Sequence, residues 1–338
     1  MKNIIIQIKI LIYNLIITPY LKYRKKNKLI KNTIDWDKER LLKYGFGYSS
    51  TKENLLSNLR MKIHFIEKGL TMPEIRPCFG IMRLKQIAEI TEKLGNSNAH
   101  EFEMQYAHKL MIEYLQYHSS HNIELPLEHI FFINKIIKTT ELTKDTPPTQ
   151  QRHYTKSEYF NISDGSFSQI ALSRHSVRNY IDKPIDQLVF KEIAKIANTA
   201  PSACNRQPCR MHVITNRLLI NSIFTLGVGC NGFGHLAPAL IIVTSDLECR
   251  DNITERFQVG VDAGFYGMNL LYALHEKHIG TCVLNWDNIK EQDEKLRQIV
   301  PSLTDSETVL FFISCGYTPD EFYIPLGLRK NNNIVWSE

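Results

Sequence analysis

The stretch RHSVR occupies residues 174–178 and places two guanidinium groups and a hydroxyl close together. Because alternate residues of an extended segment point the same way, Arg174, Ser176 and Arg178 would share one side. Arginine binds phosphate through paired hydrogen bonds and a hydroxyl adds a further donor, so this side suits a phosphate. A solvated basic loop would have the same composition, and short basic clusters are common.

A second stretch, APSACNRQP, occupies residues 200–208. Pro201 forbids a preceding helix from continuing, and a strand is expected to follow. The loop offers backbone amides and the polar side chains of Ser202, Asn205, Arg206 and Gln207. Such a set can hydrogen-bond the polar edge of a ring in a dry pocket. An ordinary capped connection between a helix and a strand would look similar.

In this order, the two stretches resemble the nitroreductase family, whose members open with R-(R/H)-S-x-(R/K) and continue through a helix to APS-x-x-N-x-QPW. Further segments similar to the family follow in sequence: Asp262-Ala263-Gly264 with Asn269-Leu270-Leu271, Gly280-Thr281-Cys282, Ile313 to Tyr317, and Arg329-Lys330. The resemblance extends from Gln169 to about Asn331, which is about half of the chain. It implies an α+β fold with a central sheet flanked by helices, and an obligate homodimer with two FMN sites at its interface.

The resemblance also implies which residues would contact FMN. The phosphate and ribityl chain would be held by Arg174, His175, Ser176 and Arg178, and Arg178 would also lie near the ring. The ring would meet Ser202, Asn205 and Gln207, some of them from the second subunit. Leu284 and Asn285 would make backbone contacts to flavin N5 and O4. Arg329 and Lys330 would close over the phosphate. The flavin would carry the chemistry, so no side chain is predicted to be catalytic.

Three positions depart from the family pattern. Cys209 stands where the family usually has a tryptophan, which would loosen aromatic packing there. Asn285 and Trp286 replace commoner small or acidic residues, which would alter the substrate face. Cys204 lies in the predicted flavin loop, where it could be redox-active, but a small buried space-filler is the favoured interpretation.

Hydrophobic patterning extends these expectations along residues 165–338. Asp186 can cap a helix whose inner face includes Val189, Ile193, Ile196 and Ala197. A helix apolar on most faces is expected at 259–277, capped by Gly280, and such a helix is often buried in a subunit interface. Strands are expected at 211–215, 239–244, 281–284 and 309–314.

Residues 1–150 are predicted to form a mostly helical N-terminal extension of unknown role. Residues 138–164 are polar, contain Pro147 and Pro148, and predict a linker or long surface loop. The string HFIEKGL at 64–70 resembles an extension found on some longer nitroreductase-like proteins. It is interpreted either as a charged helix face ending in a glycine cap, or as a substrate lid or partner surface.

The first residues require a separate interpretation. The segment 4–21 is rich in isoleucine and leucine, but Gln7, Lys9, Asn14 and Pro19 interrupt it, and a basic cluster at 22–31 follows. This pattern suits neither a membrane-spanning helix nor a signal peptide. A helix that packs on the rest of the protein is favoured, and membrane-surface contact through residues 4–31 is the alternative.

Composition limits the classes of function. The net charge of +6 is modest and no basic patch interleaved with aromatics recurs, so nucleic-acid binding is not expected. The seven cysteines are odd in number and form no CxxC pair, which argues against disulfides and zinc and favours the cytoplasm.

These observations predict an FMN-dependent oxidoreductase. Hydride would pass in a ping-pong cycle from NAD(P)H through FMN to an electron-poor acceptor, such as a nitroaromatic or quinone. Without a GxGxxG motif, the nicotinamide cofactor would bind only transiently, and the sequence does not distinguish NADH from NADPH. Two alternatives remain: a specialised enzyme that acts on a halogenated aromatic or on flavin, and an FMN-binding interaction protein with little turnover.

Overall fold

A four-stranded antiparallel sheet lies at the centre of the second half of the chain. In the computed structural model the spatial order is β2 (Cys209–Ile214), β3 (Ala239–Asp246), β5 (Glu307–Gly316) and β4 (Gly280–Leu284). Every residue of β3 is buried, as its continuous apolar run predicts. The four expected strands are all present, with small shifts at their ends.

The structure describes residues 6–7, 11, 13–44, 51–143, 151–250, 253–287, 289–325, 327 and 329. Lys330 and the segment after it lie outside the described residues, and so do residues 144–150 of the expected linker.

Helices cover both faces of the sheet, and the predicted α+β fold is confirmed. One face packs against α9 (Gln187–Ala197) and α11 (Gln258–Glu276), the other against α10 (Arg217–Phe224) and α12 (Lys290–Ile299). Short turns connect these elements: η3 (Ala203–Asn205), η4 (Gly234–Leu236), η5 (Leu247–Cys249) and η6 (Ile253–Glu255).

Two helix ends show how local chemistry sets the boundaries. The Asp186 side chain caps α9 as predicted, because it accepts a hydrogen bond of 2.8 Å from Leu188 N. The inner face of α9 comprises Phe190, Ile193 and Ala197. The expectation that Gly280 caps α11 is wrong, because His278 adopts the left-handed backbone (φ 57°) and Gly280 already begins β4.

The polar segment 138–164 is not simply a linker. It contains β1 (Arg152–Thr155) and α7 (Lys156–Phe160), followed by α8 (Phe167–Ser173). Strand β1 pairs antiparallel with β6 (Glu321–Ile324) near the end of the chain. The pairing buries Phe160 and Phe322 in the core of the second half, and it explains why so polar a segment is ordered.

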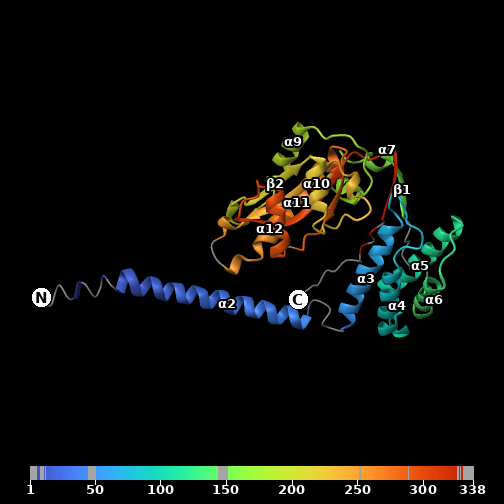
Figure 1. The fold of residues 1–338 in the computed structure, drawn as a ribbon, viewed down its shortest axis with the longest axis horizontal. Coiled ribbons are helices and arrows are strands. Elements are labelled where there is room, and N and C mark those ends of the chain that lie inside the picture. Colours follow the sequence, from blue (N-terminus) through green and yellow to red (C-terminus); the bar gives the residue numbers. More distant parts are fainter. Residues whose placement is uncertain are drawn as a thin grey trace.

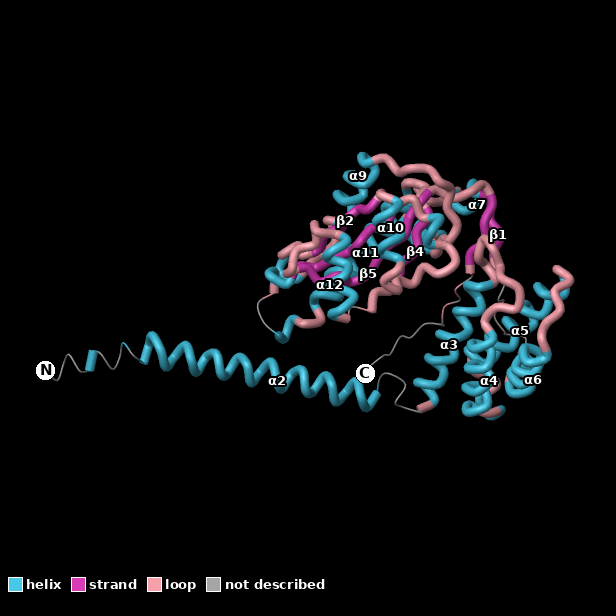
Figure 2. The backbone as a smooth tube through the Cα atoms, in the orientation of Figure 1, coloured by secondary structure: helices cyan, strands magenta, loops and turns pink. Residues whose placement is uncertain are grey.

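The N-terminal helices build a separate core. These helices are α3 (Lys52–Gly69), α4 (Ile81–Leu94), α5 (Phe102–Ser120) and α6 (Leu127–Thr139), with the turn η2 (Asn96–Asn98). Leu59, Ile63 and Met111 are fully buried among them. Figure 1 shows this group at one side of the sheet, and Figure 2 shows that the group is helical.

The expectation that the first helix packs on the rest of its own chain is wrong for the residues that are described. The short π-helix η1 (Tyr13–Ile17) continues into α2 (Thr18–Tyr44), a long helix that projects away from α3–α6 (Figure 1). Leu15, Ile16 and Tyr20 are exposed. Near its other end Asp37 forms an ion pair with Arg256, whose Nη2 donates to Oδ1 at 2.8 Å.

No helix among the described residues has the length and apolar character needed to cross a bilayer.

Candidate functional site

The RHSVR stretch adopts the extended conformation that its predicted role requires. The chain leaves α8 at Arg174, and Ser176 then forms a parallel bridge to Thr281 beside the edge strand β4. Val177 N donates to Thr281 O at 2.8 Å, and the Val177 side chain is fully buried. Val177 therefore anchors the stretch to the sheet, while Ser176 and Arg178 alternate with it along the backbone.

A tyrosine that the sequence interpretation missed holds the backbone of this stretch. The Tyr159 hydroxyl donates to His175 O at 3.0 Å and accepts from His175 N at 2.9 Å. Tyr159 lies in α7 and is almost fully buried. No local signal marked it, because its segment has the composition of a linker. On the other side of the stretch, the Ser173 hydroxyl lies 2.8 Å from His275 Nε2.

The stretch carries positive charge that no carboxylate of the described residues neutralises within ion-pair distance. Burial lowers the pKa of His175; its hydrogen bond to Ser173 O opposes this, and Arg174, Arg152 and Arg329 lower the pKa further. Among the described residues, none of these three arginines forms an ion pair, and the buried Nε of Arg174 has no hydrogen-bond partner. A buried donor without a partner is costly, so this cluster suits an anion.

Arg178 is the most enclosed of the predicted cations, with 8% of its surface exposed. Its Nη1 donates weakly to Ser176 O at 3.4 Å, and its guanidinium carbon lies 5.9 Å from the centre of the Phe233 ring. The described part of the chain offers it no carboxylate within ion-pair distance. A buried and unpaired charge of this kind favours a nearby negative group.

The two residues predicted to contact the flavin ring lie at the end of β4, where the chain passes from the core to the surface. Leu284 is buried, whereas the next residue, Asn285, is exposed and donates through Nδ2 to Asp287 Oδ1 at 2.7 Å. Trp286 is buried edge-on against Phe312, with ring centres 5.3 Å apart. Of the two departures at this point, only Asn285 can alter a substrate face, because Trp286 packs into the core.

The loop that follows Pro201 has an unusual backbone. Cys204, Asn205 and Gln207 have φ angles of 53°, 55° and 49°. Left-handed backbone is uncommon for residues other than glycine and clusters at binding sites. Gln207 N donates to the Ser202 hydroxyl at 2.9 Å, and Gln207 Nε2 donates to Asn205 Oδ1 at 3.1 Å. These bonds hold the strained loop closed with Asn205 and Gln207 exposed.

The two predicted stretches pack at opposite ends of α11. Ala203 N donates to Asp262 Oδ1 near the start of the helix at 3.3 Å, whereas Ser173 contacts His275 near its end. At about 1.5 Å of rise per residue, Asp262 and His275 are about 20 Å apart along the helix axis. Within one chain, then, the phosphate-type stretch and the polar loop are well separated.

The two cysteines of this region do not share one environment. Cys204 is exposed, so the interpretation of this residue as a buried space-filler is wrong for the single chain. The left-handed turn directs its side chain outward. Cys209 is half-buried at the start of β2, and burial raises the pKa of its thiol to about 11, which keeps it protonated near neutral pH.

Two residues of the C-terminal arm, Gly327 and Arg329, are described. Gly327 N donates to Glu67 Oε1 of α3 at 3.0 Å, and Arg329 lies close enough to His175 to lower its pKa. The role predicted for Arg329 at a phosphate stays a prediction. Lys330 lies outside the described residues.

The HFIEKGL string is not a solvated charged face. Glu67 is 1% exposed, and besides Gly327 it accepts from the Tyr106 hydroxyl and lies 2.9 Å from His64 Nδ1. Burial raises its pKa, but these hydrogen bonds outweigh burial, and the net pKa lies below the ordinary value. Glu67 therefore stays ionised and joins α3 to α5 and to the C-terminal arm.

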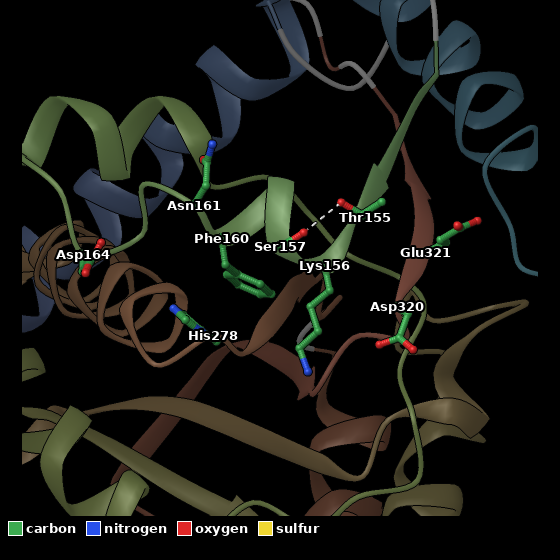
Figure 3. Close-up of a pocket in the computed structure, with 9 residues that line it drawn as sticks. All are labelled: Thr155, Lys156, Ser157, Phe160, Asn161, Asp164, His278, Asp320 and Glu321. Atoms are coloured by element: carbon green, nitrogen blue, oxygen red, sulfur yellow. Dashed lines mark hydrogen bonds between the residues drawn. The ribbon is translucent and has the colours of Figure 1, made fainter.

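A separate hollow of about 750 Å³ lies beside α7 and contains none of the predicted flavin residues (Figure 3). Lys156 faces it together with Asp164, Asp320 and Glu321, while His278 stacks on Phe160 with ring centres 5.1 Å apart. The hollow is lined by more carboxylates than cations, in contrast to the arginine-rich stretch around His175. Among the described residues, no cluster of histidine, cysteine or carboxylate side chains is suited to a metal ion.

Comparison with known proteins finds relatives of the second half of the chain. The model of the nitroreductase family matches residues 171–226, which include both the RHSVR stretch and the left-handed loop. A protein of Archaeoglobus fulgidus named "Putative NADH dehydrogenase/NAD(P)H nitroreductase" is 28% identical over 160 residues, covering 44% of this chain and 83% of that protein. An NADH dehydrogenase of Thermus thermophilus is 36% identical over 84 residues, which are 23% of this chain and 38% of that protein.

Among solved structures, an FMN-dependent nitroreductase of Clostridium difficile is 22% identical, with a TM-score of 0.37. The match covers 43% of this chain and 83% of that one. The family model and the relatives confirm the resemblance of the second half to the nitroreductase family, and they support an oxidoreductase. The helices α3–α6 stand before the matched region as an N-terminal extension.

Proposed function

We propose that the protein is an FMN-dependent oxidoreductase that uses NAD(P)H to reduce an electron-poor acceptor such as a nitroaromatic or a quinone. The observation that carries the proposal is the buried Nε of Arg174, which has no hydrogen-bond partner among the described residues and belongs to the same short stretch as the enclosed Arg178. A flavin phosphate would supply the missing acceptor and the missing negative charge, so the residues present fit FMN.

The proposed role of each residue follows from its position in the site. Arg174, Ser176 and Arg329 would bind the phosphate, while the exposed end of β4 would orient the ring through backbone contacts at Leu284 and Asn285. Arg178 would hold a positive charge near the ring, which favours the negative charge acquired on reduction. When bound, FMN supplies the hydride chemistry, and the protein binds, orients and tunes it.

The proposal includes a homodimer. Because the left-handed loop lies at the other end of α11 from the arginines, Ser202, Asn205 and Gln207 would reach an FMN held by a second copy. α11 presents an apolar stripe for such contact: Phe257, Val261 and Phe265 are 63%, 42% and 49% exposed at four-residue spacing. Gly260 and Gly264 beside them have open space where a Cβ would stand. An exposed apolar helix face of this kind favours a protein interface.

The seven cysteines are free thiols, which fits a reducing compartment, and we therefore place the protein in the cytoplasm.

The test is to purify the full chain, release any chromophore by denaturation, and mix the holoprotein with NADH or NADPH in a stopped-flow instrument. We expect released FMN from the denatured protein, and rapid bleaching of the visible flavin absorbance when the holoprotein is mixed with the nicotinamide cofactor. A protein that binds no FMN even after reconstitution would overturn the proposal. FMN that stays oxidised with both nicotinamide cofactors would favour the alternative of a binding protein with little turnover.

A further inference from the structure

A cavity of about 690 Å³ lies between the N-terminal helices and the second half of the chain. One wall comes from α3, the loop after it and the start of α4; the other comes from residues 229–235, before β3. The volume falls within the range of small-molecule sites, roughly 300–1,000 Å³. The HFIEKGL string forms part of this wall.

Positive charge predominates in the cavity. Lys68, Arg76 and Arg83 line it, and within the described chain none of them forms an ion pair. The lining includes one carboxylate, Glu74, and one imidazole, His235. The cations therefore outnumber the carboxylate, and a ligand with negative charge would be attracted.

An aromatic surface accompanies these cations. Lys68 Nζ lies 4.5 Å and the Arg83 guanidinium carbon 4.4 Å from the centre of the Phe65 ring. Phe79 and Phe233 also line the cavity. Aromatic walls with a few directed charges are typical of sites for planar, charged small molecules.

The wall is built by close packing. A Cβ at Gly69 would lie 2.1 Å from the Phe79 ring, so only glycine lets that ring close against α3. Gly80, with φ at +82°, then turns the chain into α4, which carries Arg83. The loop between the helices is thereby held in a fixed shape, and Lys68, Arg76 and Arg83 line the cavity beside it.

The cavity adjoins the proposed flavin site. Phe233 lies in its wall and is 5.9 Å from the Arg178 guanidinium carbon. Gly229, also in the wall, faces Asn285, whose N would lie 3.9 Å from a Cβ at that glycine. Burial lowers the pKa of Lys68, and the nearby charges of Arg178 and Arg83 lower it further. Cys282 and Glu67 act in the opposite direction, but the net pKa is lowered. The two sites thus share one electrostatic environment.

We propose that this cavity binds the electron acceptor, and that the acceptor is a planar compound with an acidic substituent, either carboxylate or phosphate. Lys68, Arg76 and Arg83 would bind the acidic group, and the aromatic walls would orient the ring toward Asn285 and the flavin. The inference rests on the proposed function and adds its substrate class. In each reductive step the acceptor would take up two electrons and two protons: the hydride from the nicotinamide cofactor accounts for both electrons and one proton, and water supplies the second proton.

The experiment compares 4-nitrobenzoate with its uncharged methyl ester as acceptors for the holoprotein. We expect kcat/KM to favour the acid, and Arg76→Gln or Arg83→Gln to reduce that preference by about tenfold, since a charged hydrogen bond contributes roughly 1.5–3 kcal/mol. Lys93→Gln is the matched control, because Lys93 is an exposed cation of α4 that does not line the cavity. The rate of flavin reduction by NADH should stay unchanged in the Lys93→Gln control.

Two outcomes would overturn the inference. One is a wild-type protein that reduces the ester as efficiently as the acid. The other is a pair of arginine variants that raise the KM for NADH and leave the acceptor preference unchanged, which would assign the cavity to the nicotinamide cofactor. Calorimetry with benzoate separates the inference from the proposed function. Benzoate binding that is weakened by Arg76→Gln supports the anion site even if no flavin is reduced, and absence of binding contradicts it.

Discussion

The two halves of the chain gather positive charge in different ways. In the second half, Arg174 and Arg178 are neighbours in sequence, and an extended strand-like segment brings them to one side. In the first half, Lys68, Arg76 and Arg83 come from a helix, a loop and the next helix. The comparison teaches that a group of cations adjacent in sequence can be found from a short motif, whereas a cavity assembled by helix packing is visible only after folding.

The largest expected effect concerns assembly, because loss of the dimer should abolish FMN binding in the second half and leave the cavity beside α3 able to bind benzoate. Phe265→Asp places a charge in the exposed apolar stripe of α11, so we expect a monomer in light scattering and loss of FMN. The cavity beside α3 lies within one chain, so benzoate should still bind. Lys290→Asp, an exposed change on α12, should leave the dimer intact. A wild-type monomer that holds FMN would contradict the predicted interface, which should exceed roughly 2,000 Å².

The next effect tests the motif itself. Arg174→Ala and Arg178→Ala should each weaken FMN binding by about tenfold or more, because a charged hydrogen bond contributes roughly 1.5–3 kcal/mol. Fluorescence titration of the apoprotein with FMN measures this. Lys195→Ala, an exposed cation of α9, should change nothing. If both arginine variants retain full flavin, the phosphate assignment is wrong.

A smaller effect concerns Glu67, which joins the two halves. Its pKa is lowered in the folded chain, so its charge stabilises the fold above the ordinary pKa of about 4.3. This contribution is lost as the pH falls through the lowered value. We expect Glu67→Gln to reduce the free energy of unfolding by about 1–3 kcal/mol at pH 7. The difference from wild type should shrink under strongly acidic conditions.

Denaturant unfolding at several pH values measures the Glu67 effect. Glu89→Gln, an exposed carboxylate on α4, serves as the control and should show no such difference. A Glu67→Gln protein that is as stable as wild type at pH 7 would mean that the buried carboxylate does not hold the arm to α3.

The smallest effect concerns the contact between α2 and the second half. Arg256→Gln removes the ion pair with Asp37, and because both side chains are partly exposed, such a pair contributes little to stability. We expect the thermal midpoint to fall slightly and FMN affinity to stay the same. Lys38→Gln on the exposed side of α2 is the matched control. A large loss of stability would show that α2 contributes more to the fold than this one contact.

Patterns with strong periodicity were predictable, and the errors arose where distant contacts decide. The strand β3, the capped helix α9 and the long helix α11 follow directly from local patterning. Strand β1 could not be predicted, because its residues are polar and its partner β6 lies more than a hundred residues away. The exposed position of Cys204 depends on the left-handed turn that the Ser202 hydroxyl helps to close.

The sequence by itself determined the family resemblance, the α+β class and the phosphate-type stretch, because each depends on residues close together along the chain. Only the tertiary structure decided that Tyr159 holds that stretch, that Glu67 is a buried joint, and that three cations of the N-terminal half face one cavity. The physical reason is the distance along the chain between the residues that make each contact. Helix and strand patterns express local burial, whereas a buried charge or an assembled cavity is the sum of contacts between segments far apart in sequence.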